Sequence, residues 1–510
     1  MTDQRAAIRN NAKYLRQVRP IDPEEIADYV EGSPHPAVVR QTLREEAFDL
    51  GLWEREDGTF VPFEAGPAPR ADWEPTAFPE EYSFALEDLL VREYGANWHQ
   101  GDSGDALREA ISRLKTDYFY ENDVEYDETA ALGYAVYHLP DYYAEVGYVL
   151  DDLAENDLLP TKLRVLDVGA GAGGPALGLF DYLPDDALVD YHAIEPSPAV
   201  DVLEAMLNET GRNVRTTIHE TTVEAFEPSD AVSADDAVVG DADTDDDAST
   251  DDEHDGSGGF DLVLFGNVLS ELSDPTAVVS RAMDWLTPDG AVLAIAPADR
   301  NTAIGLRAVE RAVVPAESQA SVYSPTLRLW PGHAPSDTGW SFDVRSDIEA
   351  PPFQTRLDAG GDDDGTYTNE TVQFAYALLR PDGNRRVEVR ADAARFARMA
   401  DMERHVTERI DVVAVKLSRD LSRIGPDARD DAHRGPADPD PNPVFKIGDG
   451  SESVDHYAVV TKESALNRDL FQADYGAVVA VENVLALWND DEQAYNLVVD
   501  AETVVDLVAP

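Results

Sequence analysis

The sequence contains no cysteine. This absence excludes disulfides, thiolate metal sites, iron–sulfur clusters held by the chain's own cysteines, and a cysteine nucleophile. Long apolar runs are also missing: no stretch reaches the roughly 18 apolar residues that a membrane-spanning helix needs. The segment before Asp22 is charged and lacks an apolar run, so no signal peptide is expected. We therefore expect a cytoplasmic protein.

Lysine is scarce as well. Only 6 of the 40 basic residues are lysines, and 102 acidic residues give a net charge of -62. An acidic excess spread along the whole chain is typical of adaptation to a very salty cytoplasm, whereas an acidic tail would explain only local runs. At 1 M salt the screening length is about 3 Å, so this charge does not exclude nucleic-acid binding. The usual test, a basic surface patch, is uninformative here.

Glycines crowd one segment that follows an apolar strand. Residues 165–174 read Val-Leu-Asp-Val-Gly-Ala-Gly-Ala-Gly-Gly and lead into a predicted helix over 175–182. Glycines in such a turn let the backbone approach a cofactor, and the N-terminus of the helix favours nearby negative charge. Gly169, Gly171 and Gly174 also fit the G-x-G-x-x-G pattern of dinucleotide sites, so glycine spacing alone leaves the cofactor class open.

Two acids and a third strand favour S-adenosylmethionine (SAM). Asp167 precedes the glycines, where a carboxylate suits an ammonium and a sulfonium better than a pyrophosphate. A second predicted strand, 189–194, ends at Glu195, where a carboxylate can accept both ribose hydroxyls. A strand over 260–265 resembles the fourth strand of class I methyltransferases. NAD-type binding and an empty, degenerate site stay open as alternatives. The residues expected to hold the methionine end are Asp167, Gly169, Gly171 and Gly173, with Glu195 on the ribose.

The pattern of strands and helices predicts an α/β fold with a Rossmann-like methyltransferase core over residues 159–382. Alternation of strand and helix favours a parallel sheet. The predicted strands are 163–167, 189–194, 214–218, 260–265, 291–296 and 371–380, and the predicted helices are 175–182, 198–209, 275–286 and 302–313. Residues 228–259 interrupt this domain with eleven aspartates in a Ser/Gly/Ala background. They cannot bury enough apolar surface to fold, so we expect a disordered acidic insertion and no metal site, with a metal-binding acid cluster as the alternative.

Regions on both sides of the core have their own signatures. Residues 1–65 predict a winged-helix-like unit, with helices at 23–30 and 37–50 and a hairpin around Asp57-Gly58. Its second helix, with Arg40 and Arg44, either contacts nucleic acid or has a purely structural or docking role.

Residues 66–158 are expected to form a helical cap whose many tyrosines belong to the core. Residues 383–443 are expected to be a helix plus a linker. Residues 444–510 are rich in strand patterns and predict a small β-barrel, possibly OB-like. Such barrels often bind oligonucleotides, although a fold does not establish a function.

The catalytic signal is weak. Methyl transfer needs an aligned acceptor, exclusion of water and sometimes a base. C5 methylation of a pyrimidine by the usual route needs a cysteine, and this chain has none. The Asp/Asn-Pro-Pro-aromatic motif of enzymes that methylate amino groups is missing after the fourth strand. Asn267 and Glu271 lie there instead, although Glu271 could simply open the next helix. Asp299, Arg300 and Arg307 follow the fifth strand and are expected near phosphate or a lid.

Several segments resemble the methyltransferase-like protein family of the mitochondrial small ribosomal subunit. They are Leu269-Ser270-Glu271-Leu272, Leu139-Pro140-Asp141-Tyr142-Tyr143-Ala144, the helix from Arg300 to Pro315, Trp340-Ser341-Phe342, and the stretch from Ala465 to Gly476. The resemblance covers roughly residues 130–480 and implies a SAM-binding fold that assists assembly of the small ribosomal subunit. It also implies cysteines that hold an iron–sulfur cluster, and Ala316 and Ser341 stand where two of them are expected.

Three hypotheses follow from the sequence. The first is a SAM-dependent methyltransferase acting on the small ribosomal subunit or its rRNA. The second is a non-catalytic assembly factor with the same fold. The third is a winged-helix regulator that senses SAM. The sequence leaves the acceptor atom, the turnover and the oligomeric state open.

Overall fold

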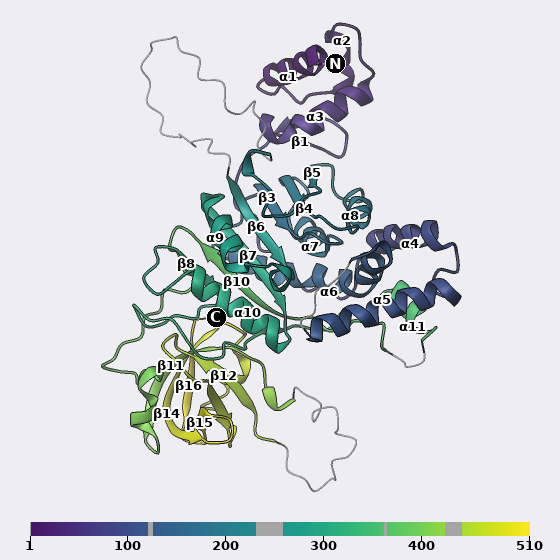
Figure 1. Cartoon of the computed structure of the whole chain (residues 1–510). Helices are drawn as coiled ribbons and strands as arrows, with labels where there is room; N and C mark the ends of the chain where they lie inside the picture. Colours follow the sequence, from purple (N-terminus) through teal and green to yellow (C-terminus); the bar gives the residue numbers. More distant parts are fainter. Residues whose placement is uncertain (1, 121–125, 231–258, 362–364, 424–440, 510) are drawn as a thin grey trace, which may run out of the picture. The chain divides into compact units, whose positions relative to one another are not determined.

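The computed structural model describes residues 2–120, 126–230, 259–361, 365–423 and 441–509 (Figure 1). Most of the predicted acidic insertion and residues 424–440 of the predicted helix-plus-linker region lie outside these ranges. The chain divides into two compact units. The first comprises residues 1–266, 284–290 and 348–370, and the second comprises 267–283, 291–347 and 371–510.

The first unit begins with three helices and a hairpin. These are α1 (Thr2–Leu15), α2 (Pro23–Tyr29), α3 (Pro36–Leu50), β1 (Leu52–Glu54) and β2 (Phe60–Pro62). Asp22 caps α2 by accepting the Glu24 N–H, and Gly51 ends α3 at a φ of 58°. The two predicted helices and the antiparallel hairpin are confirmed. Helix α1 was not predicted, although Ile8, Ala12 and Leu15 already give it one buried face.

A helical region follows, as predicted. It contains α4 (Glu80–Tyr94), α5 (Gly101–Tyr120) and α6 (Glu128–Ala154). Tyr143 and Tyr148 on α6 are buried, which agrees with the core role expected for the tyrosines. Pro140 lies inside α6 and cannot donate the helical hydrogen bond to the carbonyl of Val136. Gln354 of α11 (Pro352–Asp358) donates to that carbonyl instead, at 2.8 Å.

The central sheet contains the predicted strands. They are β3 (Lys162–Val168), β4 (Leu188–Ile194), β5 (Val214–His219), β6 (Phe260–Gly266), β7 (Leu286–Pro297) and β10 (Gln373–Arg380), together with the unpredicted β8 (Ser321–Ser324) and β9 (Asp343–Val344). Their order is β5-β4-β3-β6-β7-β10-β8, with β9 on β10. Strands β4 and β6 are both parallel to β3, whereas β10 is antiparallel to β7. The order reverses at β3, and a doubly wound sheet binds ligands outside the carboxyl ends of its strands at such a point.

Helices near the sheet also match the prediction. They are α7 (Gly174–Tyr182), α8 (Val200–Leu207), α9 (Pro275–Asp284) and α10 (Arg300–Val313), with short 3-10 turns η1 (Pro228–Asp230) and η2 (Leu269–Glu271). Helix α7 packs tightly against α6. A Cβ at Gly174 would lie 2.8 Å from the Tyr142 Cβ, and one at Gly178 would overlap the carbonyl oxygen of Tyr143. Glycine therefore allows these two helices to touch.

The second unit ends in a closed five-stranded barrel. Its strands are β11 (Arg409–Lys416), β12 (Val444–Gly448), β13 (His456–Val460), β14 (Val478–Asn489) and β15 (Ala494–Val499), and the turns η3 (Met399–His405), η4 (Leu421–Arg423) and helix α12 (Asp469–Gln472) accompany them. The pairing runs β11-β12-β13-β15-β14 and returns to β11. Only β13 and β15 are parallel. This five-stranded closure is the barrel that the sequence predicted, and its strand circuit is that of an OB-fold.

Two strands of this region were missed. Strand β11 lies within 383–443, where a helix and a linker were predicted, and the helical segments described there are the short 3-10 turns η3 and η4. The apolar residues Val412 to Val415 gain their partners only from β14, far along the chain. Strand β16 (Val504–Ala509) adds to β14 beside the barrel. Its outer edge is covered locally, because the Val505 N–H donates to the Leu466 carbonyl and the Leu507 N–H to Asp469.

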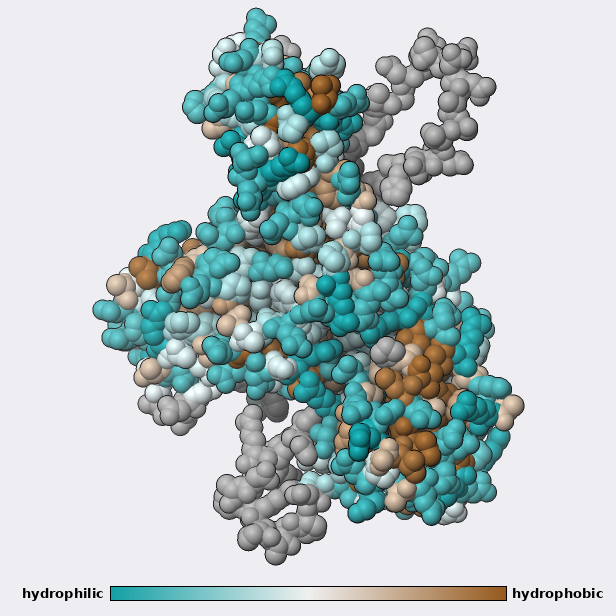
Figure 2. Space-filling model, turned by 180° about the vertical axis from the view of Figure 1, so that it is seen from behind, coloured by the Kyte–Doolittle hydropathy of each residue, from teal (hydrophilic) through white to brown (hydrophobic). Residues whose placement is uncertain are grey.

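Figure 2 shows apolar side chains gathered on the surface of the C-terminal region. Leu466, Leu507 and Val508 are between 45 and 49% exposed there. Among the described helices, none combines the length and apolar character needed to cross a membrane.

Candidate functional site

The turn after β3 has the backbone geometry of a cofactor loop. Gly169, Gly171 and Gly173 have φ values of 68°, 53° and 89°, which side chains with a Cβ rarely adopt. The N–H groups of Gly169 and Ala170 both donate to the carbonyl of Ile194 at the end of β4. The loop is thus fixed at the carboxyl end of the central strands, where α7 begins.

Glu195 holds this loop directly. It is 5% exposed, its Oε2 accepts the Gly171 N–H at 2.8 Å, and its Oε1 accepts the Ser197 N–H at 2.8 Å. Each carboxylate oxygen has a second lone pair, so the group still has capacity for ribose hydroxyls. The structure therefore brings together Glu195 and Gly171, which the sequence placed in one site. The clamp on the glycine loop is an additional role that strand spacing alone did not reveal.

Asp167 is 1% exposed. Its Oδ2 accepts the hydroxyl of Tyr191 at 2.7 Å, and its Oδ1 is buried with no hydrogen-bond partner in the described part of the chain. Burial raises the pKa of this carboxyl to about 7; the Tyr191 hydrogen bond opposes the shift and the charge of Glu195 adds to it. A buried acceptor without a donor is costly. An ammonium group such as that of SAM would supply the missing donors, so these residues fit the cofactor.

Open space lies next to the Glu195 loop. A cavity of about 390 Å³ is bounded by α4, the start of α6 and α8. Its lining includes Pro198, Asp201, Val202, Leu132 and Arg92. Its volume is in the range of small-molecule sites, and it begins three residues after the acid expected to hold the ribose.

The weak catalytic candidates lie just beyond β6. Asn267 has a φ of 62° and is 5% exposed, and its N–H donates to the carbonyl of Ile295 at 3.0 Å. Glu271 is exposed and ends the 3-10 turn η2, while α9 begins only at Pro275. Glu271 therefore does not open the next helix. A catalytic role for either residue stays a prediction.

The expectation for the residues after the fifth strand was wrong in part. Asp299 caps α10 by accepting the N–H groups of Asn301 and Thr302. Arg307 is 1% exposed and bonded to Glu310 at 2.5 Å and to the carbonyl of Tyr376 at 2.7 Å. A guanidinium this deeply buried cannot reach a phosphate at the surface.

The two arginines of the winged-helix-like unit are already paired. Arg44 makes a two-point contact with Glu54, at 2.5 and 3.2 Å, and Arg40 lies 3.5 Å from the same carboxylate. Glu54 is 3% exposed, so its charge needs these partners. This geometry favours the structural role for Arg40 and Arg44 over nucleic-acid contact.

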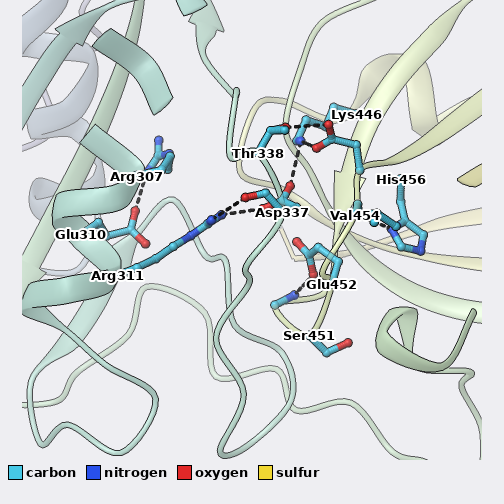
Figure 3. Close-up of polar contacts among 12 residues, drawn as sticks. Arg307, Glu310, Arg311, Asp337, Thr338, Lys446, Ser451, Glu452, Val454 and His456 are labelled. Carbon is cyan, nitrogen blue, oxygen red and sulfur yellow. Dashed lines mark hydrogen bonds and ion pairs between the residues drawn. The ribbon is translucent and has the colours of Figure 1, made fainter. Parts of the chain in front are cut away.

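A buried polar cluster occupies the second unit (Figure 3). Asp337 accepts from Arg311 at 2.6 Å and from Lys446 on β12 at 2.9 Å, and Lys446 also pairs with Asp455. The cationic partners hold the pKa of Asp337 well below its usual range. Lys446 lies on the outer face of β12, so residues before β9 cover part of the face that OB-folds use for oligonucleotides.

Acidic groups elsewhere in this cluster are held by the backbone. Glu452 accepts the N–H groups of Asp449 and Gly450, and burial together with the charges of Asp449 and Asp337 raises its pKa to about 8. Across the ranges that the structure describes, no three His, Asp or Glu side chains are arranged to hold a metal ion.

The positions where the resemblance implies cysteines differ from each other. Ala316 is exposed, whereas Ser341 is buried and its hydroxyl lies 2.6 Å from that of Tyr475. Tyr475 also accepts from Arg307 at 3.3 Å. A polar network of ordinary side chains thus surrounds Ser341.

Three protein-family models match the chain. Residues 166–292 match the methyltransferase domain. This part of the chain is therefore a methyltransferase-like domain. Residues 5–56 match the N-terminal domain, and residues 400–508 the C-terminal domain, of a family described as a domain of unknown function (DUF8157). No curated protein matches the chain.

Solved structures of methyltransferases are also similar in part. Mitomycin 7-O-methyltransferase MmcR is 14% identical, with 58% of this chain and 75% of that chain covered and a TM-score of 0.22. The plantazolicin methyltransferase BpumL in complex with SAH is 11% identical, with 60 and 99% covered and a TM-score of 0.26. The CurJ carbon methyltransferase is 15% identical, with 58 and 72% covered and a TM-score of 0.24. Values this low carry no argument about substrate.

Proposed function

We propose that this protein transfers a methyl group from SAM to the small ribosomal subunit, with its rRNA as the acceptor. SAM binding is supported chiefly by the hydrogen bond from the Gly171 N–H to Glu195, in a loop where three glycines have left-handed backbone conformations. The buried, unpartnered Oδ1 of Asp167 supports the placement of the methionine ammonium. The proposal that small-subunit rRNA is the methyl acceptor rests on the sequence resemblance to the small-subunit family. The OB-like barrel is compatible with this acceptor.

Two measurements test SAM binding and the acceptor separately. Calorimetric titration with SAM should show binding that Glu195→Ala weakens by at least about tenfold, because each lost charge-assisted hydrogen bond contributes about 1.5 kcal/mol or more. Glu227→Ala, a change to an exposed acid beyond β5, is the matched control. Absence of binding would contradict the enzyme and the sensor alike.

RNA mass spectrometry of a deletion strain tests the acceptor. Small-subunit rRNA should lose a methyl group that returns with the intact gene and not with the Glu195→Ala variant. An unchanged methylation map would favour the second candidate, a non-catalytic assembly factor. One observation supports that candidate: the segment after β6 lacks the Asp/Asn-Pro-Pro-aromatic motif.

Co-purification distinguishes the third hypothesis. An rRNA methyltransferase or assembly factor should recover small-subunit components, and a SAM-sensing regulator should recover DNA sites. The pairing of Arg40 and Arg44 with Glu54 counts against the regulator, because these cations were its expected DNA contacts. We propose that the protein acts in the cytoplasm, because the proposed acceptor, the small ribosomal subunit, is located there.

A further inference from the structure

One face of α6 carries a stripe of three rings. Tyr134, His138 and Tyr142 are spaced by four residues, which places them above one another on a helix. The ring centroids of Tyr134 and His138 are 5.1 Å apart, and those of His138 and Tyr142 are 4.8 Å apart with nearly parallel planes. The two phenol rings also contact each other, with centroids 5.9 Å apart, so the imidazole packs against both rings of a three-ring cluster.

This stripe lies against the glycine loop. A Cβ built at Gly171 would be 3.8 Å from the Tyr134 ring, and one at Gly174 would be 2.8 Å from the Tyr142 Cβ. The two outer members of the stripe thus contact the two ends of the loop. His138 lies on α6 about one helical turn from each of these two tyrosines and packs against both of their rings, beside the loop over which the methionine end of SAM is proposed to lie.

A carboxylate orients the imidazole. Nδ1 of His138 lies 3.3 Å from Oδ2 of Asp141, and the Asp141 side chain is only 7% exposed. The same oxygen accepts the Asn369 side-chain N–H at 2.7 Å. His138 itself is 21% exposed, and its Nε2 has no hydrogen-bond partner among the described residues. A base held by one nitrogen, with the other available, has the geometry of an acid–base dyad.

The dyad is anchored through the proline in its own helix. The backbone N–H of Asn369 donates to Gln354 Oε1 at 3.0 Å, and Gln354 Nε2 donates to the carbonyl of Val136 that Pro140 leaves free. Gln354 is completely buried. Contacts of this kind fix the rotamer of a functional side chain, as a catalytic group requires.

Few titratable or charged groups lie around His138 in the described part of the chain. On α6 it meets the Asp141 carboxyl, whose pKa burial raises while the contact with His138 opposes the shift, and the phenols of the stripe. From α5, Lys115 stacks on the ring of Tyr137, its nitrogen 3.7 Å from the centroid. The segment around residue 369 contributes an amide, and the glycine loop contributes backbone groups tied to the carboxylate of Glu195.

We propose that His138 is the general base of methyl transfer and that Asp141 is its positioning residue. This inference rests on the proposed SAM-dependent function. It requires an acceptor that carries a proton on nitrogen or oxygen, such as a ring or exocyclic N–H of a base or a ribose hydroxyl. It places the base on the helical region that precedes the glycine loop in the sequence.

The reaction balances with no further reagent. The lone pair of the acceptor nitrogen or oxygen forms the bond to the methyl carbon, and the carbon–sulfur bond breaks with its electron pair on sulfur. The acceptor proton passes to Nε2 of His138 and then to water. The imidazole returns to its neutral form, and S-adenosylhomocysteine leaves as a neutral thioether.

A chemical footprint tests the position of His138 without a known acceptor. Diethyl pyrocarbonate acylates neutral imidazole, and mass spectrometry of the full-length protein follows each histidine. S-adenosylhomocysteine at about ten times its Kd should slow acylation of His138 about tenfold. The matched control is His405, which lies 3.4 Å from Glu408 at the same i,i+3 spacing and is 29% exposed. Its acylation should not change.

Kinetics with small subunits from a deletion strain test the chemistry. His138→Gln should bind S-adenosylhomocysteine as the parent does and lower kcat by about 10²- to 10⁴-fold. The pH–rate profile of this variant should differ from that of the parent protein, because the general base is missing. Asp141→Asn should lower kcat with the fold and cofactor binding retained, which a calorimetric titration checks.

The outcomes separate this inference from the proposed function. If the parent protein binds neither SAM nor S-adenosylhomocysteine, the proposed function and the role of His138 fail together. If S-adenosylhomocysteine binds but leaves His138 as reactive as before, the inference is overturned and the proposed function stands. Full kcat with an unchanged pH profile in His138→Gln would overturn it as well.

Discussion

The contact between Gln354 and the proline-containing helix allows a quantitative prediction. Gln354→Leu keeps the side-chain size but removes the donor to the Val136 carbonyl, and both groups are completely buried. A buried carbonyl left without a partner costs about 1–3 kcal/mol. In Pro140→Ala, the new N–H of residue 140 supplies the ordinary helical hydrogen bond to that carbonyl. Gln354→Leu should then cost about 1–3 kcal/mol less than it does in the parent protein.

Hydrogen–deuterium exchange measures this difference locally, which suits a chain of several units whose global unfolding is not two-state. Peptides from α6 should exchange faster in Gln354→Leu by about a factor of ten for each 1.4 kcal/mol. The factor should shrink when Pro140→Ala is added. Gln41→Leu on α3, where the glutamine is exposed, is the control and should leave α6 unchanged.

Additivity decides the outcome. Independent sites add within about 0.5 kcal/mol, whereas residues that share a partner do not. If Gln354→Leu and Pro140→Ala change α6 exchange additively, Gln354 does not replace the hydrogen bond that the proline removes. The anchoring of the His138 dyad through Val136 would then be wrong.

Three further predictions concern other parts of the chain. The folded-state pKa of Glu452 is raised to about 8, so its contribution to stability is fully present below about pH 4.5 and is lost as the pH rises through 8. Glu452→Gln cannot ionise and should remove this fall in stability at high pH. Thermal melts of both proteins at several pH values would show the difference. Gly178→Ala should destabilise α7 by about 1–3 kcal/mol through overlap with Tyr143, and the control Gly305→Ala, with nothing within 4 Å, should stabilise α10 by up to about 1 kcal/mol; hydrogen–deuterium exchange of peptides from each helix measures both changes. Lowering the salt concentration should lower the melting temperature, because the net charge of -62 repels itself less when it is screened; equal melting at low and high salt would contradict the proposed salt adaptation.

Strong local patterns made much of the fold predictable. The core strands are short apolar runs bounded by polar residues, so β3, β4 and β6 appeared within one residue of their predicted ends. Asp22 and Gly51 marked helix ends through capping chemistry that acts over three residues. Strand β11 was missed because its apolar run from Val412 to Val415 is stabilised by partners in β14, which lies about sixty residues later.

The candidate site shows the same division. Asp167, Gly171 and Glu195 could be proposed because each lies at or just after the end of a strand that the sequence marks. The dyad of His138 and Asp141 could not be proposed from the sequence. Its recognition requires the hydrogen bond from Asn369, which lies 228 residues from Asp141, and the contact of α6 with the glycine loop. The spacing of four between aromatic residues was visible, but it does not distinguish a helix core from a wall facing a ligand.

Strand β16 bears on how this protein behaves when it is concentrated. An uncovered strand with exposed Leu507 and Val508 would offer a template for pairing between molecules. Two of its outward N–H groups are already used by Leu466 and Asp469, while the barrel itself closes without an end strand. Asp469→Ala would reopen part of that edge. The first sign of its loss would be self-association at high protein concentration, with cofactor binding intact.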